Sequence, residues 1–378
     1  MEPVKDTENM DNTANAEKRR ERETQPLVSI EGLRVSFPFE SGPSGTSPSR
    51  TGKIWPVDGV SLRILPGETL GLVGESGSGK SMTSLALMGL LPRPHGKIEA
   101  GSIKFRGREL VGLGDKELMK MRGKDISMIF QDPMTSLNPV YTVGDQIAEA
   151  LRAHERIPRS EARKRAVAML GRVGIPSPEK RVDAWPHLLS GGMRQRVMIA
   201  MALALYPALL IADEPTTALD VTIQAQILCL MGDLKRDFGM SVLLITHNLG
   251  LVAENADRTA VMYAGRILEE AATEELFRAP SHPYTRGLLD SIPRMTGTDK
   301  ELKAIPGMVP ALQDLPTGCK FANRCSFCEP RCGIEEPPIF ETSAARDAHG
   351  EGAHGKSAHG VRCWRFDGGK NVKRGAPS

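Results

Sequence analysis

Eight residues between an apolar run and a helical pattern constrain this chain more than any other feature. Gly74 to Ser81 reads GESGSGKS and fits G-x-x-x-x-G-K-[ST] at every fixed position. The apolar run from Thr69 to Val73 predicts a buried strand before this segment, and Ser81 to Leu91 predicts a helix after it. A strand, a glycine-rich turn and a helix in this order indicate an α/β fold with a phosphate-binding loop.

Each part of this loop has a chemical reason. Glycine allows the backbone to turn its N–H groups toward phosphate oxygens, and the helix N-terminus adds partial positive charge. We expect Lys80 to reach the β- and γ-phosphates and the Ser81 hydroxyl to bind Mg²⁺. The alternative is a flexible turn beside a surface lysine. The residues predicted to bind ATP are Gly74, Glu75, Ser76, Gly77, Ser78, Gly79, Lys80 and Ser81.

A second apolar run, Ala208 to Ala212, is followed by two carboxylates. The carboxyl ends of parallel strands are where nucleotide-binding sheets carry their chemistry. We expect Asp213 to hold Mg²⁺ and Glu214 to polarise the attacking water as general base. A solvated acidic loop is the alternative interpretation.

The segment Leu189 to Gln195 reads LSGGMRQ and lies at the start of a helical pattern. The Ser190 hydroxyl and the neighbouring glycine N–H groups can form a second anion site at a helix N-terminus. Because the phosphate loop already holds one nucleotide, this segment is useful if it caps the ATP of another subunit. A simple helix cap is the alternative.

These motifs, in this order, resemble those of ATP-binding cassette (ABC) proteins. The resemblance implies that Gln131 touches Mg²⁺ and senses the γ-phosphate, and that His247 contacts the γ-phosphate. It also implies that Ala218 to Asp220 crosses the seam between two subunits. The segment that contacts the partner's ATP is then Leu189, Ser190, Gly191, Gly192, Met193, Arg194 and Gln195.

The family also stacks an aromatic ring on adenine. Phe37 matches that position, and Trp55, beyond the loop from Ser41 to Gly52, is the alternative.

The resemblance implies an α/β P-loop ABC nucleotide-binding domain. Its expected parts are a mostly parallel core sheet with helices, an antiparallel β subdomain and a helical subdomain over about residues 132–195. We expect a disordered tail over 1–26, the ATP-binding domain over 27–277 and a small irregular cysteine-containing region over 278–378.

Three further segments resemble the dipeptide, oligopeptide and nickel importer branch: Asp132–Pro139, His282–Arg286 and Gly318–Cys325. The branch implies an ATP-hydrolysing subunit on the cytoplasmic face of the membrane. Its partners would be a second ATPase subunit, two permease subunits and an extracytoplasmic substrate-binding protein, with residues 132–146 near the permease. Peptide is the implied substrate, and nickel, glutathione or another small solute remain open.

Five of the six cysteines lie near the C-terminal end. Cys319, Cys325, Cys332 and Cys363 resemble the pattern that holds a four-iron four-sulfur cluster in some members of this branch, while Cys328 is an extra cysteine within it. Thiolates also suit zinc, and free thiols are the third possibility.

Two other groups of residues have simpler interpretations. Cys229 is expected to be a small core residue. The histidines at 349, 354 and 359 lie in a Gly/Ala-rich stretch, which indicates a solvated linker, with metal binding as the alternative.

The composition excludes several other classes. The formal net charge is only +3, which gives no electrostatic case for nucleic-acid binding. The longest apolar run, Val197 to Ala212, is interrupted by Pro207 and is short for a membrane span, so we expect a soluble chain whose membrane role goes through a partner. A soluble ABC ATPase of DNA repair or translation is the remaining alternative, while a P-loop kinase or GTPase has no use for Leu189–Gln195.

Overall fold

The computed structural model describes residues 25–41, 50–131, 136–216, 219–292, 305–342 and 359–369. The predicted N-terminal tail lies almost wholly outside these ranges. So do Asp132–Thr135 of the importer-like segment, Ala218, His349 and His354. Within the described ranges, no helix combines the length and apolarity that a membrane crossing requires.

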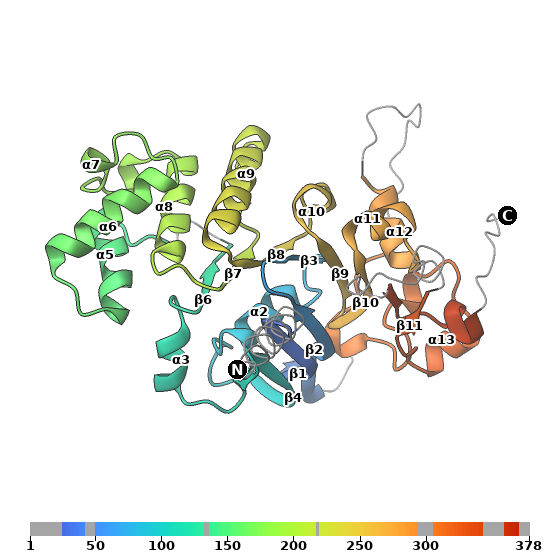
Figure 1. The fold of residues 1–378 in the computed structure, drawn as a ribbon. Coiled ribbons are helices and arrows are strands. Elements are labelled where there is room, and N and C mark those ends of the chain that lie inside the picture. Colours follow the sequence, from blue (N-terminus) through green and yellow to red (C-terminus); the bar gives the residue numbers. More distant parts are fainter. Residues whose placement is uncertain are drawn as a thin grey trace, which may run out of the picture.

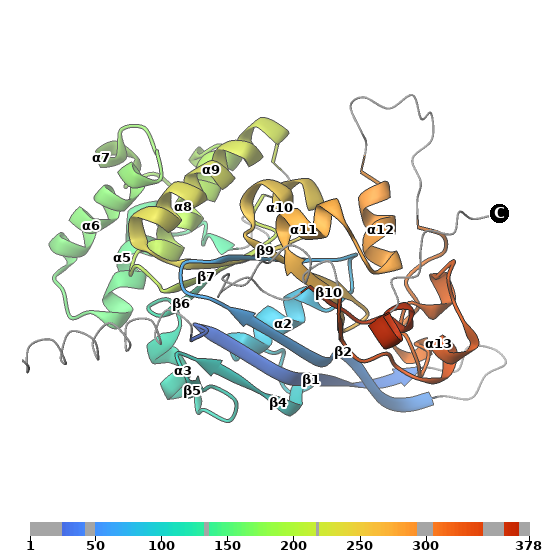
Figure 2. The same ribbon diagram turned by 45° about the vertical axis from the view of Figure 1, so that its right-hand side comes forward.

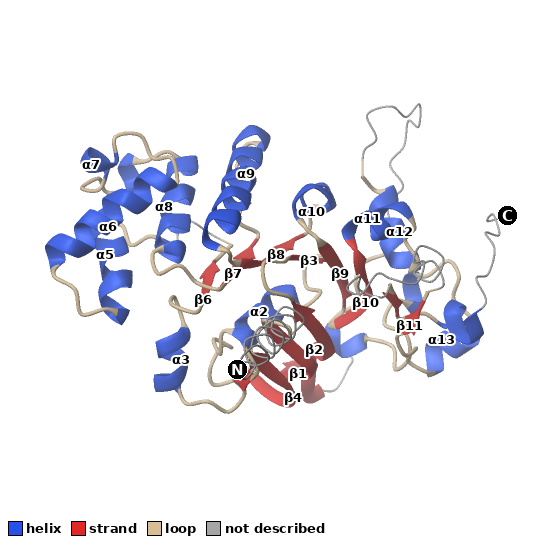
Figure 3. Ribbon diagram, in the orientation of Figure 1, coloured by secondary structure: helices blue, strands red, loops and turns tan. Residues whose placement is uncertain are grey.

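An eight-stranded sheet runs through the centre of the molecule (Figures 1 and 3). Five adjacent strands on one side of the sheet are parallel, and the three at the opposite edge pair antiparallel. In spatial order the strands are β11 (Phe340–Glu341), β12 (Gly360–Val361), β10 (Arg266–Ala272), β9 (Arg258–Tyr263), β3 (Thr69–Val73), β8 (Ser241–Thr246), β7 (Leu209–Asp213) and β6 (Ile126–Ile129).

Every residue of β3, β7, β8 and β9 is buried, because both faces of this sheet are covered. Along β7, Leu209 and Ile211 belong to one buried cluster, whereas Leu210 and Ala212 belong to the other. The first cluster also contains residues of the smaller antiparallel sheet described below. The second contains residues of the helices on the other face of the central sheet. The two hydrophobic cores therefore pack on opposite faces of the sheet. The loops at the carboxyl ends of its strands lie between these cores.

A four-stranded antiparallel sheet forms the β subdomain, which lies below the central sheet in Figure 2. Its order is β2 (Arg50–Ile64), β1 (Val28–Ser41), β4 (Lys97–Phe105) and β5 (Arg108–Glu109). The two long strands of this sheet, β1 and β2, pair as far as Ser41 and Arg50. Helix α2 (Lys80–Leu87) lies between the two sheets.

Helices between β6 and β7 form a separate group at one end of the molecule (Figure 1). They begin with α5, whose N-cap Thr142 accepts a hydrogen bond from the backbone N–H of Asp145. The group consists of α5 (Val143–His154), α6 (Arg159–Arg172), α7 (Pro178–Arg181), the 3₁₀ turn η1 (Pro186–Leu188) and α8 (Gly191–Leu203).

Other helices connect or cover the sheets. They are α3 (Asp115–Met121), α9 (Val221–Phe238), α10 (Leu249–Asn255), α11 (Thr273–Arg278), α12 (Pro283–Asp290) and α13 (Pro330–Ile334), with 3₁₀ turns η2 (Leu312–Asp314), η3 (Ala322–Arg324) and η4 (Trp364–Gly369).

The C-terminal region adds two strands to the central sheet. Strand β12 pairs with β10, and β11 pairs with β12. His359, just before β12, has no exposed surface, and its ring nitrogens lie 2.7 Å from Glu269 Oε1 and 3.1 Å from Glu275 Oε1. The expectation of a solvated linker is therefore wrong for His359, because two carboxylates compensate the burial of its ring.

Cys229 also differs from its prediction. It lies on α9 but is exposed, so it is not a core residue. The buried residues of that helix are Ile227, Leu228, Met231 and Leu234. Position 229 lies just outside this buried stripe.

Candidate functional site

The phosphate loop (Gly74–Ser81) lies between β3 and α2, as the sequence predicts. Gly74 and Gly79 have φ values of 154° and 104°. A Cβ atom at Gly74 would lie 2.0 Å from the Met262 carbonyl oxygen, and one at Gly79 would lie 2.1 Å from that of Pro56. Glycine is therefore required at both positions by the close approach of neighbouring backbone.

Lys80 is held inside this loop. Its Nζ atom donates to the carbonyl oxygens of Gly74 (2.8 Å) and Glu75 (3.0 Å), and its side chain is buried. Burial lowers the pKa of Lys80, and the nearby carboxylates of Glu214, Asp213 and Glu75 oppose this shift. The ammonium group is thus fixed at the start of α2, next to the carboxylates of Asp213 and Glu214 at the end of β7.

Asp213 ends β7 and is 4% exposed. Burial raises the pKa of its carboxyl, and a hydrogen bond with the Ser81 hydroxyl opposes that shift. Its Oδ1 atom is buried and has no hydrogen-bond partner in the described part of the chain. A buried carboxylate oxygen without a partner, beside a serine hydroxyl, is a donor set that suits a hard cation such as Mg²⁺.

Glu214 lies within hydrogen-bond distance of two other predicted residues, Gln131 and His247. Its Oε2 atom accepts a hydrogen bond from Gln131 Nε2 at 3.2 Å, and its Oε1 atom lies 3.0 Å from His247 Nδ1. Gln131 follows β6, Glu214 follows β7 and His247 follows β8, so three adjacent parallel strands supply them. The Glu214 side chain is 14% exposed and that of His247 is 62% exposed.

The segment Leu189–Gln195 contains both exposed and buried residues. Ser190 is exposed and caps α8, its hydroxyl accepting from the Met193 N–H at 3.4 Å. Leu189 and Gln195 are buried, and the Gln195 amide donates to the Pro215 carbonyl. Only the start of α8 is therefore available to a ligand, while Gln195 connects α8 to the loop after Glu214.

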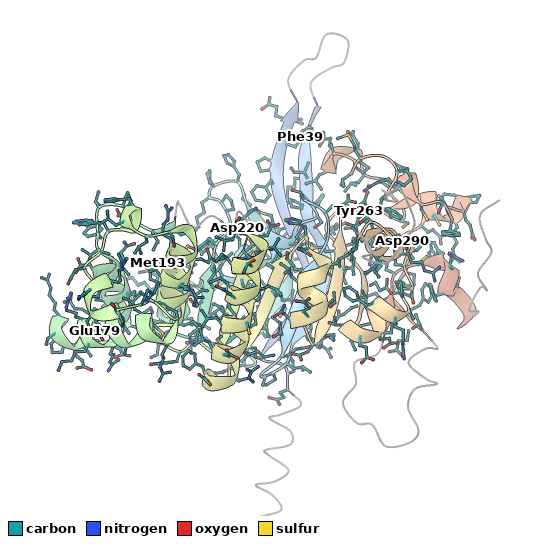
Figure 4. All side chains as sticks on the ribbon, turned by 90° about the horizontal axis from the view of Figure 1, so that it is seen from above. Phe39, Glu179, Met193, Asp220, Tyr263 and Asp290 are labelled. Atoms are coloured by element: carbon teal, nitrogen blue, oxygen red, sulfur yellow. The ribbon has the colours of Figure 1, made fainter. Side chains whose placement is uncertain are left out.

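Helix α8 and the phosphate loop lie in different parts of the molecule. In Figures 1 and 2, α8 belongs to the helical group and α2 lies under the central sheet. Figure 4 shows Met193 on this helix, with Asp220 at the start of the neighbouring α9. At the start of α8, a Cβ atom at Gly191 would lie 3.7 Å from Leu219, so this end of α8 lies beside the residues that precede α9.

The two aromatic candidates for adenine have different surroundings. Phe37 is half-buried, and its ring lies against Gly96, where a Cβ atom would be 2.9 Å away. The Trp55 ring lies 4.6 Å from the Arg34 guanidinium carbon. Trp55 directly precedes Pro56, whose carbonyl contacts Gly79 of the phosphate loop. The adenine contact stays a prediction for both.

The four cysteines predicted to hold a cluster lie around one cavity. Cys319, Cys325, Cys332 and Cys363 line one cavity, whereas Cys328 is exposed and does not line it. Burial raises the pKa of Cys319 to about 12 and that of Cys325 to about 11, so both are neutral thiols in this arrangement. Among the residues that the structure describes, no three His, Cys, Asp or Glu side chains are grouped so that they could hold a metal ion. The expected iron–sulfur cluster and the zinc alternative are thus without support from the geometry.

Two residues at the phosphate loop were not assigned roles from the sequence. The Arg324 guanidinium pairs with the Glu75 carboxylate, and the Tyr284 hydroxyl accepts from the Glu75 N–H. Both lie in segments that resemble the importer branch, which was the available signal. That resemblance does not predict their contact with the phosphate loop, because both residues are more than 200 residues away from it along the chain.

Comparisons with known proteins agree with this geometry. Residues 57–217 match the family model described as "ABC transporter", and residues 268–332 match "Oligopeptide/dipeptide transporter, C-terminal region". The oligopeptide transport ATP-binding protein OppD of Bacillus subtilis is 56% identical over 318 residues, covering 84% of this chain and 86% of OppD. The dipeptide transport ATP-binding protein DppD of the same organism is 51% identical over 301 residues, covering 80% of this chain and 87% of DppD.

A solved structure with a similar fold is the dimeric ATP-binding cassette MJ0796 in a post-hydrolysis state bound to ADP and Pi. It is 29% identical with a TM-score of 0.55, covering 65% of this chain and 99% of that one.

Proposed function

This chain belongs to the family of ABC transporter ATP-binding proteins, and we propose that it is the ATP-hydrolysing subunit of an importer that takes up peptides. The observation that carries the ATPase assignment is the position of Glu214 between Gln131 and His247, beside Lys80. Peptide as the substrate is supported by the names of the relatives OppD and DppD.

The phosphate loop supplies the nucleotide site. Its backbone N–H groups and the N-terminus of α2 attract the phosphates, and Lys80 pairs with the β- and γ-phosphate oxygens. Ser81, Gln131 and Asp213 would hold Mg²⁺, which neutralises phosphate charge when bound. Phe37, or Trp55 in its place, would stack on the adenine ring.

Glu214 is the proposed general base. Its carboxylate accepts the proton of the attacking water, and Gln131 and His247 fix the orientation of that carboxylate through their hydrogen bonds. His247 is exposed enough to contact the γ-phosphate as well. Catalysis then depends on positioning more than on covalent chemistry.

The start of α8 would complete the site of a second ATPase subunit. Ser190 is exposed at the N-terminus of a thirteen-residue helix, where N–H groups and the helix dipole favour an anion. Within one chain this end of α8 lies apart from the phosphate loop (Figure 1), which favours a site shared by two subunits, identical or related. Loss of the γ-phosphate would then weaken the pair.

The remaining partners would be two permease subunits and an extracytoplasmic substrate-binding protein. Val140 and Tyr141, which follow Gln131, are 65% and 53% exposed. Apolar side chains this exposed are suited to contact another protein, so they support the proposal that residues 132–146 lie near the permease. The subunit would sit on the cytoplasmic face of the membrane.

We also propose the predicted division of the chain, with an ATP-binding domain over 27–277 and a C-terminal region over 278–378. The composition change after residue 277 supports this boundary.

The cysteine cavity carries a separate proposal, that Cys319, Cys325, Cys332 and Cys363 ligate a four-iron four-sulfur cluster. The support for it is the cysteine pattern of the sequence; the described side chains are not grouped to hold a metal ion, and binding must displace the thiol protons. Anaerobic purification with iron analysis and a visible spectrum tests it. A protein without iron and without visible absorbance would reject the cluster.

The transport function is tested by reconstituting the chain with its permease and substrate-binding proteins. We expect ATP-dependent uptake of labelled peptides into vesicles. Uptake of nickel or glutathione, with no uptake of peptide, would contradict the substrate. Stable association with DNA or ribosomes, without transport, would favour a soluble ABC ATPase.

A further inference from the structure

Glu75, the second residue of the phosphate loop, is held by two side chains from the C-terminal region. The Arg324 Nη1 and Nη2 atoms donate to its two carboxylate oxygens at 2.7 and 3.2 Å. The Tyr284 hydroxyl accepts a hydrogen bond from its backbone N–H at 3.0 Å. The loop therefore has a bidentate ion pair and a backbone hydrogen bond to segments beyond residue 277.

These contacts are protected from water. The Arg324 side chain is 6% exposed, the Glu75 side chain is 26% exposed and Tyr284 is fully buried. The Arg324 guanidinium carbon also lies 5.8 Å from the centre of the Tyr263 ring and 6.0 Å from that of Phe321. Tyr263, labelled in Figure 4, ends β9 next to the phosphate loop. Ring packing therefore fixes the guanidinium in one orientation.

The charge of Glu75 is a problem for a loop that binds phosphate. An uncompensated carboxylate here would repel a triphosphate, and the repulsion would be strong because the loop is partly removed from water. Arg324 cancels that charge. The Glu75 carbonyl also accepts from Lys80 Nζ at 3.0 Å, so movement of Glu75 would disturb the lysine as well.

We propose that Arg324 and Tyr284 are positioning residues for the phosphate loop, acting through Glu75, so that nucleotide affinity depends on the C-terminal region. Arg324 neutralises and orients the carboxylate, while Tyr284 fixes the backbone at the same residue. This inference rests on the proposed function, since it takes the loop to be the nucleotide site. The nucleotide site then extends beyond the ATP-binding domain.

The test measures the Kd of MgATP for the full-length chain by calorimetry. Arg324→Gln is expected to raise the Kd roughly tenfold, and less at high salt, because the uncompensated charge is then screened. In the E75Q background the same substitution is expected to change the Kd little, since no carboxylate remains to be compensated. Arg324→Lys, which keeps the charge, is expected to recover part of the affinity.

Two further variants separate positioning from folding. Tyr284→Phe keeps the buried ring and removes only the hydroxyl, and it is expected to raise the Kd about threefold. Arg331→Gln is the matched control, because Arg331 also lies in the C-terminal region but forms an exposed ion pair with Asp367. The control is expected to bind MgATP like the unmodified chain.

Three results would overturn the inference. One is an unchanged Kd in folded R324Q. Another is that R324Q lowers the affinity for MgATP equally in the presence and absence of the Glu75 carboxylate. If R324Q does not fold, unchanged Kd values in both R324K and Y284F would overturn it. Failure of the unmodified chain to bind MgATP is a different result and would contradict the proposed function itself.

Discussion

The Nδ1 atom of His247 lies 3.0 Å from Oε1 of Glu214. The two residues follow adjacent parallel strands, β8 and β7, so their approach is a property of the sheet. Glu214 adopts a φ of 48°, an uncommon backbone conformation for a residue with a side chain. A strained backbone at a residue held by two side chains is typical of functional sites.

Replacing Glu214 with Gln tests the general base. Hydrolysis is expected to fall roughly a hundredfold or more, because the amide cannot accept the proton of the attacking water. ATP binding is expected to persist, since Lys80 and the loop N–H groups are unchanged. ATPase rates and MgATP affinity of the same preparation check both statements. Glu254→Gln, at an exposed position on α10, is the control, and equal turnover in both variants would remove Glu214 from this role.

Replacing Lys80 with Ala tests the phosphate loop. The Kd for MgATP is expected to rise roughly a hundredfold, because a buried charge that pairs with phosphate is lost. Lys116→Ala removes an exposed lysine on α3 and is expected to leave the Kd unchanged. Titration with a fluorescent ATP analogue measures both variants. An unchanged Kd in K80A would show that phosphate binds elsewhere.

Replacing Ser190 with Arg tests the shared site. The large side chain is expected to block the partner's nucleotide, so hydrolysis by the assembled transporter falls roughly a hundredfold. Binding of MgATP to the isolated chain is expected to stay normal, because its own phosphate loop lies elsewhere. Ser160→Arg, at an exposed site on α6, is the control. Weakened binding by isolated S190R would instead indicate that Ser190 serves its own chain.

Replacing His359 with Gln tests the buried ion pair of the C-terminal strands. Burial alone would lower the pKa of His359, but hydrogen bonds and charge from Glu269 and Glu275 outweigh it and raise the pKa above 6.5. A raised pKa in the folded state stabilises the fold below pH 6.5, and this contribution is lost as the pH rises through the folded pKa.

The H359Q variant is therefore expected to lose about 3 kcal/mol of stability at pH 5.5. The difference from the unmodified chain is expected to shrink toward pH 9.5. Thermal unfolding across this range measures the difference, with His187→Gln at an exposed position as the control. A gap in Tm that is constant with pH would show that His359 is neutral in the fold.

Much of the candidate site could be predicted from short motifs in the sequence. The phosphate loop, the carboxylates after Ala212 and the serine before α8 each depend on a few consecutive residues, so their predicted contexts are confirmed. Strands β9 and β10 were not predicted. Their pairing with other parts of the chain, including β12, is stabilised by contacts distant in sequence, which no local pattern records.

His359 and Cys229 show the same limit for single residues. The Gly/Ala-rich sequence around His359 does not indicate the two carboxylates that β10 and α11 place beside its ring. The periodic pattern of α9 predicts a helix, and yet the position of the buried stripe depends on what packs against it.

The sequence by itself determined which chemical groups are present and their local settings: a lysine at a helix start, carboxylates at a strand end and thiols near the C-terminus. Only the tertiary structure decided which of them meet, as with Arg324 and Glu75, 249 residues apart. The reason is that backbone conformation follows from neighbouring residues, whereas charge compensation at a buried group depends on whatever the fold brings beside it.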